Sequence, residues 1–169
     1  MSETSPGNLI LAMQNPDLYD HPVDGFQVIE THISQVILTG DYAYKIKKPM
    51  DFGFLNFSTL DRRKHFCEEE LRLNRRLANK LYLEVVPITG TPDNPILGGE
   101  GEAFEYAIKM RQFGQEHLFD RLQEQGKLTP EPLTDLARQV AAFHEQLPPV
   151  PDDKPLGTPE AVFAAMQEN

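Results

Sequence analysis

The sequence predicts an α+β fold in which a five-stranded antiparallel sheet packs against one long helix and further helices follow. Two observations carry this prediction. Short segments rich in aromatic and β-branched residues fill the first two thirds of the chain, and a single helical stretch interrupts them. After Met110 the spacing of apolar residues changes from two to between three and four. The order of three strands, one helix, two strands and then helices is typical of an antiparallel sheet with a helix on one face.

The first three strands are predicted at 26–33, 35–39 and 41–49. A loose tail and one short helix at 8–14 precede them, and the apolar side of that helix is expected to dock on the main body. Gly40, with the aspartate that follows it, is a two-residue hairpin signal between the second and third strands. These strands are therefore expected to pair in sequence order as antiparallel neighbours.

The long helix is predicted at 60–78, where apolar residues recur with helical spacing. The segment 49–57 before it contains a proline, a glycine and scattered aromatic residues, so we expect it to be irregular. Ser58 and Asp61 resemble a capping box at the start of the helix.

Two more strands follow, at 81–88 and 103–110, and are expected to pair with each other. Between them, 89–101 contains four glycines and two prolines and is predicted to be a turn region. Glu105 and Lys109 are predicted to point outward. The residues predicted to point inward are Phe104, Tyr106, Ile108 and Met110.

Helices are predicted for the rest of the chain. The first covers 115–125 and ends at Gly126. The second begins at Pro130, a favoured residue in a first helical turn, and ends before the proline-rich segment 148–151. A brief third helix is predicted at 159–166.

A glutamate lies among the apolar residues of the long helix. Its apolar stripe comprises Phe66, Leu73 and Leu77, and Glu70 falls on the same side. A buried carboxylate costs several kcal/mol unless it is paired. Lys45 on the third strand is the nearest cation that could face it, with Lys47 two residues further along the same face. The sequence therefore predicts an ion pair between Lys45 and Glu70; the alternative is that both charged groups are solvated.

The composition excludes several classes of function. A length of 169 residues, with 40% hydrophobic and 25% charged residues, suits one folded domain or one domain and part of another. The net charge of -10 argues against a nucleic-acid partner. The five histidines show no ligand spacing, so no metal site is expected. The single cysteine, Cys67, excludes an internal disulfide and fits a reducing compartment. Because neither a membrane-length apolar run nor a signal peptide is visible, we expect a cytoplasmic protein without a membrane partner.

Four runs of residues carry a resemblance to a known family. They are Glu-Thr-His-Ile-Ser at 30–34, Asp-Tyr-Ala-Tyr-Lys-Ile-Lys-Lys-Pro at 41–49, Asp-Phe-Gly-Phe-Leu at 51–55 and Cys-Glu-Glu-Glu-Leu-Arg-Leu-Asn at 67–74. The chain resembles bacterial proteins of the aminoglycoside-phosphotransferase-like, protein-kinase-like superfamily. It is most similar to the branch in which such a domain precedes a P-loop kinase-type ATPase domain, and it matches only the N-terminal part.

The resemblance implies a division of the chain into three parts. Residues 1–25 form the tail and short helix, 26–113 form the kinase-like small lobe, and 114–169 form the helical start of an incomplete C-terminal lobe. The fold implied for the small lobe is the five-stranded sheet with one packed helix described above.

The resemblance also implies an ATP site with magnesium. Lys45 matches the strand lysine that contacts the α- and β-phosphates, and Glu70 matches the helix glutamate that orients it. No glycine-rich loop joins the first two strands, so backbone amides and the Thr31 or Ser34 hydroxyl are expected to meet the phosphates. The residues implied to contact the adenine are the interlobe linker Met110, Arg111, Gln112 and Phe113 and the apolar wall of Val36, Ala43 and Ile108.

The catalytic loop and the metal-binding aspartate of the family are absent from this sequence. The run Asp-Phe-Gly at 51–53 spells the family's metal motif, but it lies between the lysine strand and the helix and is interpreted as a coincidence. No P-loop sequence is present either. We therefore expect no catalytic residue and no metal ligand in this chain, and the magnesium ligands are expected in a missing lobe.

These considerations lead to two hypotheses for function. The first is the ATP-binding lobe of a kinase that, in its complete form, phosphorylates a hydroxyl of an unidentified small molecule; alone, the chain is expected to be inactive. The second is a non-catalytic kinase-like binding or regulatory module. In that case the apolar residues Val162, Phe163 and Met166 are expected to be covered by a partner or by a second copy in a dimer.

Overall fold

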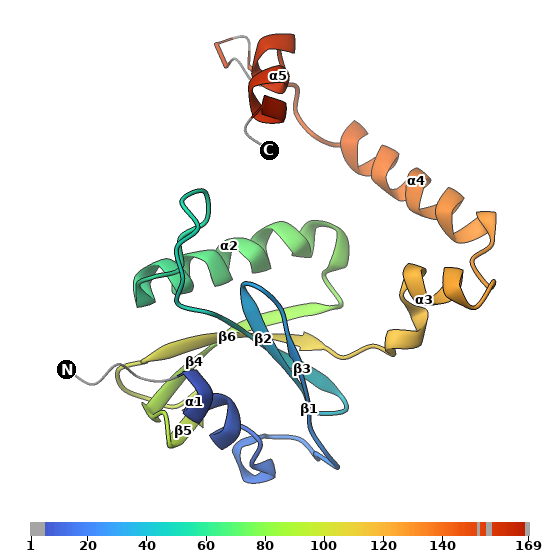
Figure 1. Ribbon diagram of the computed structural model, residues 1–169. Coiled ribbons are helices and arrows are strands. Elements are labelled where there is room, and N and C mark those ends of the chain that lie inside the picture. The colour runs from blue at the N-terminus through green and yellow to red at the C-terminus, as the bar shows by residue number, and fades with distance from the viewer. Residues whose placement is uncertain (1–5, 152, 155–156, 168–169) are drawn as a thin grey trace. The chain divides into compact units, whose positions relative to one another are not determined.

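A six-stranded antiparallel sheet forms the centre of the first of two units, Met1–Leu118, in a computed structural model that describes residues 6–151, 153–154 and 157–167 (Figure 1). The spatial order of the strands is β1-β2-β3-β6-β4-β5. The strands are β1 Gln27–Glu30, β2 Ser34–Leu38, β3 Tyr42–Lys47, β4 Tyr82–Thr91, β5 Asn94–Leu97 and β6 Glu105–Arg111. The protein is thus α+β, as the sequence predicts, but with six strands rather than five.

The additional strand lies in the segment predicted to be a turn region. β4 continues to Thr91, and β5 pairs with it through a tight hairpin in which Gly90 lies opposite Pro95. Gly90 has a φ of 82°, a conformation that glycine adopts without strain. β5 is the last strand of the sheet, and a proline is tolerated in an edge strand because one side of it needs no ladder hydrogen bond. The glycines and prolines of this segment therefore shape a hairpin rather than exclude a strand.

The remaining strand pairs agree with the prediction. β1, β2 and β3 pair consecutively as antiparallel neighbours, and β4 pairs with β6. β6 also pairs with β3, so it lies between β3 and β4 in the middle of the sheet. This arrangement places the strand that carries Lys45 next to two central neighbours.

Helix α2, Leu60–Ala78, has the predicted bounds and packs against β4 and β6. Its N-cap is Thr59, whose hydroxyl accepts a hydrogen bond from the backbone amide of Arg62 at 3.3 Å. The predicted capping box that begins at Ser58 is therefore wrong by one residue, because Thr59 is the last residue with extended backbone before the helix.

The face of α2 that points to the sheet differs from the predicted apolar stripe. Arg63 and Cys67 are its buried residues, whereas Leu73 and Leu77 are 45% and 57% exposed. The inward face therefore follows Arg63, Cys67 and Glu70 along one side of the helix. On this face, Arg63 and Glu70 find charged partners on the sheet, and Arg63 also donates to carbonyl oxygens of the neighbouring loop.

The other face of the sheet is covered by the N-terminal segment. It contains α1, Pro6–Ala12, and the short 3-10 helix η1, Pro16–Leu18. The predicted docking of this helix is confirmed, while residues 1–5 of the predicted tail lie outside the described residues. The core on this side consists of Leu9, Ile10, Met13, Ile37, Tyr44, Ile46, Ile88 and Ala107.

The second unit, Phe119–Asn169, is helical in its described part. It contains α3, Phe119–Glu124, α4, Pro130–Glu145, and α5, Pro159–Gln167. The helix predicted at 115–125 is divided into a 3-10 turn, η2, Gln115–His117, and α3. α4 begins at Pro130 as predicted. Among the described helices of both units, none is long and apolar enough to cross a lipid bilayer.

Candidate functional site

A carboxylate held between two lysines lies where α2 packs on the sheet. The Nζ atom of Lys45 donates a hydrogen bond to Oε1 of Glu70 at 2.7 Å, and Nζ of Lys47 donates to Oε2 at 2.6 Å. Lys45 and Lys47 are two residues apart on β3 and therefore point to the same face of the sheet. The predicted contact between Lys45 and Glu70 is present, and a second lysine completes the cluster.

The two lysines differ in their exposure. The side chain of Lys45 is 23% exposed, that of Glu70 is 16% exposed, and that of Lys47 is only 3% exposed. Burial raises the pKa of Glu70, but the hydrogen bonds and charges of both lysines outweigh it, so this pKa lies below its usual value. Glu70 is therefore ionised at neutral pH, and Lys45 is the member of the cluster that solvent reaches most readily.

The loop between β3 and α2 closes the buried end of this cluster. Nζ of Lys47 lies 4.8 Å from the centre of the Phe57 ring, close enough for a cation–π contact. Phe57 is itself 2% exposed and packs edge-on against Phe66 of α2. Through Phe57, the loop thus contacts both Lys47, the more buried of the two lysines, and Phe66 on α2.

A second buried ion pair joins α2 to β6. Nε of Arg63 donates to both carboxylate oxygens of Glu105 at 2.9 Å, and Nη1 of Arg63 donates to the carbonyl oxygen of Phe57 at 3.1 Å. Glu105 is 8% exposed, so the prediction that it points outward is wrong. Burial raises the pKa of Glu105 despite the opposing effect of Arg63. The alternation of residues along a strand could not predict this pair, because the partner, Arg63, lies on a helix and 42 residues away in the sequence.

Ser34, a predicted phosphate contact, lies next to the cluster but is enclosed. It pairs with Lys47 across β2 and β3, and its side chain is completely buried. Its backbone amide donates to Oγ1 of Thr31 at 3.0 Å, and no described atom hydrogen-bonds to its own hydroxyl oxygen. A contact between this hydroxyl and a ligand would therefore require the turn between β1 and β2 to move.

The predicted apolar wall is brought to the Lys45 side of the sheet by the strand register. Val36 and Ile108 lie directly on either side of Lys45, on β2 and β6. Ala43 lies two residues from Lys45 on the same face. Ala43 and Ile108 are buried, and Val36 is the partly exposed member of the three.

The predicted linker begins within β6, because Met110 and Arg111 are the last two residues of that strand. Two of its backbone amides already donate within the first unit, that of Arg111 to Leu81 at 2.8 Å and that of Gln112 to Asp41 at 3.0 Å. Met110 is still paired within the sheet, opposite Ala43. A backbone amide for an adenine edge in this segment would therefore be that of Phe113, a residue that is 45% exposed and whose carbonyl oxygen accepts a hydrogen bond from the side chain of Gln115 at 3.5 Å.

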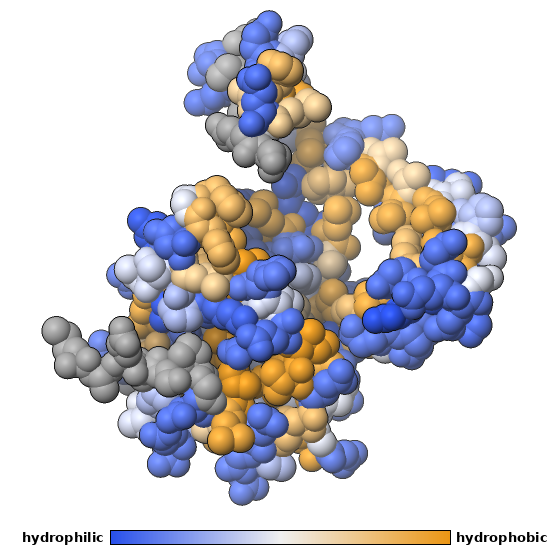
Figure 2. Space-filling model, viewed as in Figure 1, coloured by the Kyte–Doolittle hydropathy of each residue, from blue (hydrophilic) through white to orange (hydrophobic). Residues whose placement is uncertain are grey.

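The Asp-Phe-Gly run forms a local turn. Asp51 accepts a hydrogen bond from the backbone amide of Gly53 at 2.8 Å and a second, short one from the side chain of Asn56. Both oxygens of Asp51 thus stabilise its own loop, which gives the aspartate a structural role. On the same loop, Phe52 and Phe54 are 46% and 90% exposed, and Figure 2 shows apolar surface at this position above α2.

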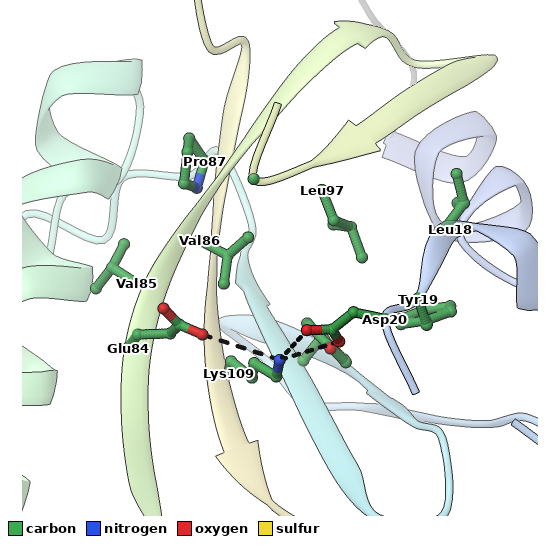
Figure 3. Close-up of a pocket in the computed structure, with 11 residues that line it drawn as sticks. Leu18, Tyr19, Asp20, Glu84, Val85, Val86, Pro87, Leu97 and Lys109 are labelled. Carbon is green, nitrogen blue, oxygen red and sulfur yellow. Dashed lines mark hydrogen bonds and ion pairs between the residues drawn. The ribbon is translucent and has the colours of Figure 1, made fainter. Parts of the chain in front are cut away.

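A separate pocket of about 190 Å³ lies on the opposite face of the sheet (Figure 3). It is lined by Tyr44, which neighbours Lys45 on β3 and therefore points the other way, and by the N-terminal segment. Nζ of Lys109 lies in it, 3.3 Å from Oδ1 of Asp20 and 3.9 Å from Oε1 of Glu84. This pocket contains none of the predicted site residues, and its charged groups pair mainly with one another. We therefore place the candidate site at the Lys45–Glu70–Lys47 cluster, where the sequence and the geometry agree.

Comparison with known proteins finds relatives without an assigned function. Three uncharacterized mycobacterial proteins are each 31% identical to this chain over 129 residues; two come from Mycobacterium tuberculosis, strains CDC 1551 / Oshkosh and ATCC 25618 / H37Rv, and one from Mycobacterium bovis. The match covers 75% of this chain and 24% of each relative, so the chain spans about a quarter of the length of these proteins. No protein-family model and no solved structure matches the chain.

Proposed function

We propose that this chain is the nucleotide-binding lobe of an aminoglycoside-phosphotransferase-like, protein-kinase-like enzyme. The observation that carries the proposal is the ion pair between Lys45 on a central strand and Glu70 on the helix that packs against it. A strand lysine held by a helix glutamate is the arrangement that orients an ammonium group toward nucleotide phosphates in such enzymes. The match with mycobacterial relatives assigns no function, so the proposal depends on this geometry and on the sequence resemblance.

The residues of the cluster fit a phosphate ligand. Two lysines and one carboxylate carry a net charge of +1, and the more exposed of the two lysines is Lys45. Charge-assisted hydrogen bonds from an ammonium group to phosphate oxygens are among the strong polar contacts in proteins. The positive charge is local, because the chain as a whole carries a net charge of -10. An anion would therefore be attracted to this position rather than to the protein surface in general.

Each residue has a distinct part in the proposed site. Lys45 binds the phosphate oxygens through its ammonium group, and Glu70 keeps that group in position. Val36 offers an apolar surface beside Lys45 for the base, and Phe113, two residues past the end of β6, offers its backbone amide. ATP, when bound with magnesium, supplies the phosphoryl group, which is transferred chiefly through positioning and charge neutralisation.

The chain itself is proposed to bind rather than to catalyse. Of the residues that the structure describes, no three histidine, cysteine, aspartate or glutamate side chains are grouped so that they could hold a metal ion. The proposal assigns the base and the magnesium ligands to another part of a longer enzyme, because the motifs that carry them in the resembling family are absent from this sequence. The mycobacterial relatives are about four times as long as the stretch that this chain matches, which is length enough for a second lobe and a further domain.

The experiment is a calorimetric titration of the 169-residue chain with ATP, carried out with and without magnesium. We expect saturable binding that Lys45→Ala reduces at least tenfold, since a direct ammonium–phosphate contact is lost. Lys80→Ala is the matched control, because Lys80 is an exposed lysine just past the end of α2. Binding that is equally strong in Lys45→Ala and Lys80→Ala would refute the assignment of Lys45, and the absence of binding by the unaltered chain would refute the proposed function.

A further inference from the structure

We infer that Lys47 is a positioning residue of the site, the internal counter-ion of Glu70 that leaves the charge of Lys45 available to a polyphosphate ligand. This inference rests on the proposed function and extends it to a residue that the lysine–glutamate pair alone does not require. Lys47 does not contact the ligand in this scheme. Its effect reaches the ligand through Glu70 and Lys45.

The first observation is the division of the Glu70 carboxylate between the two lysines. Each oxygen accepts one short hydrogen bond, Oε1 from Lys45 at 2.7 Å and Oε2 from Lys47 at 2.6 Å. A carboxylate that is pinned at both oxygens has little rotational freedom. The position of Glu70 is therefore maintained by Lys47 even when a ligand draws the ammonium group of Lys45 away.

The second observation is that Lys47 is poorly placed to meet a ligand itself. Its side chain is 3% exposed, against 23% for Lys45. Its ammonium group lies over the ring of Phe57, which is buried and packed against Phe66. A buried ammonium needs a compensating partner, and Glu70 is the carboxylate that contacts it.

The third observation is the charge that remains. A single lysine–glutamate pair is neutral, and a polyphosphate gains little Coulomb energy from a neutral pair. With Lys47 present, the three groups carry one net positive charge. Because Lys47 is enclosed, that charge is presented to solvent at Lys45. The geometry thus favours the polyphosphate part of a nucleotide over its base as the group recognised by this cluster.

Inorganic triphosphate without metal is the probe, titrated against the 169-residue chain. Lys47→Met replaces the buried ammonium with an apolar group of similar length and leaves a neutral pair of Lys45 and Glu70. We expect affinity for triphosphate to fall roughly tenfold, as the loss of one unit charge at short range predicts. The dependence of affinity on salt should weaken as well, because the site carries one charge fewer.

The charge-conserving control combines Lys47→Met with Glu70→Gln. This double variant again carries one net positive charge, on Lys45, and it has no unpaired buried charge that would prevent folding. We expect its affinity to rise clearly above that of Lys47→Met, because the net positive charge is restored, and to stay below that of the unaltered chain, because a glutamine holds the ammonium group of Lys45 less firmly than Glu70 does. A residue that only stabilises the fold would lower stability in Lys47→Met without altering the affinity of the folded fraction or its salt dependence.

The outcomes separate this inference from the proposed function. If the unaltered chain binds neither triphosphate nor ATP, both are refuted. If it binds and Lys47→Met binds equally well, the inference alone is refuted. The same holds if the double variant stays as weak as Lys47→Met. Weakening in the single variant with recovery in the double variant supports the role of Lys47.

Discussion

Replacing Glu70 with glutamine should destabilise the protein far more than the same replacement elsewhere on α2. The change removes the charge that compensates both Lys45 and Lys47, with almost no change in side-chain volume. Lys45 is partly exposed and can be rehydrated, but Lys47 is 3% exposed and would be left as a buried ammonium with no counter-ion. The cost therefore arises mainly at Lys47.

The magnitude follows from this difference in burial. Breaking a buried ion pair by removing one partner costs about 3–5 kcal/mol. The partial exposure of Glu70 and Lys45 places this case at the lower end, so we expect a loss of about 3 kcal/mol in the free energy of unfolding. For a unit of this size the melting temperature should fall by about 10 °C.

The measurement is urea unfolding of Glu70→Gln and of Glu68→Gln. Glu68 is two residues earlier on the same helix and is exposed, so its replacement should cost no more than about 0.5 kcal/mol. If the two variants unfold within about 1 kcal/mol of each other, Glu70 is not a buried counter-ion and the description of the cluster is wrong.

Three further predictions follow from the contacts. Arg63→Met should lower the free energy of unfolding in urea by about 3 kcal/mol, because Glu105 loses its buried partner. Combining it with Glu105→Leu should recover part of that loss. If the losses of the two single variants simply add, the pairing is contradicted. Gly90→Ala should lower the free energy of unfolding by about 2 kcal/mol or more, because φ is positive and a Cβ would lie 2.5 Å from a carbonyl oxygen. Gly25→Ala, with open space around it, should be nearly neutral. Equal thermal stability of the two variants would contradict the hairpin geometry. Because the pKa of Glu70 is lowered in the folded protein, its ion pairs contribute fully to stability above its unfolded pKa of about 4.3, and this contribution is lost as pH falls through the folded pKa. Below about pH 4.5, the stability of Glu70→Gln should therefore change less with pH than that of the unaltered chain. Parallel pH profiles would contradict that reading.

Local patterns in the sequence were sufficient for most of the elements. The bounds of α2, the start of α4 at Pro130 and the hairpin at Gly40 all follow from periodicity and turn chemistry within a few residues. The contact between Lys45 and Glu70 was also predicted, because a carboxylate with a buried position requires a cation nearby, although two leucines of the stripe used in that argument are exposed. Its proposed role in nucleotide binding stays a prediction.

Other features had only weak or misleading local signals. β5 was missed because its proline and the surrounding glycines indicate a turn, and only its position at the edge of the sheet makes a strand there acceptable. Glu105 was placed outward by strand alternation. The partner that allows it to be buried, Arg63, comes from a helix distant in sequence.

The sequence by itself determined most of the helices and strands and which lysines of β3 share a face, because those properties depend on neighbours a few residues away. It placed Lys45 and Lys47 on the same side of β3 and indicated that Glu70 needs a cation, but the apolar stripe from which the inward side of α2 was predicted is largely exposed. Only the tertiary structure decided which lysine is buried and which is exposed. That choice depends on where the loop containing Phe57 closes over the strand, and the packing of that loop is set by contacts between segments far apart in the chain.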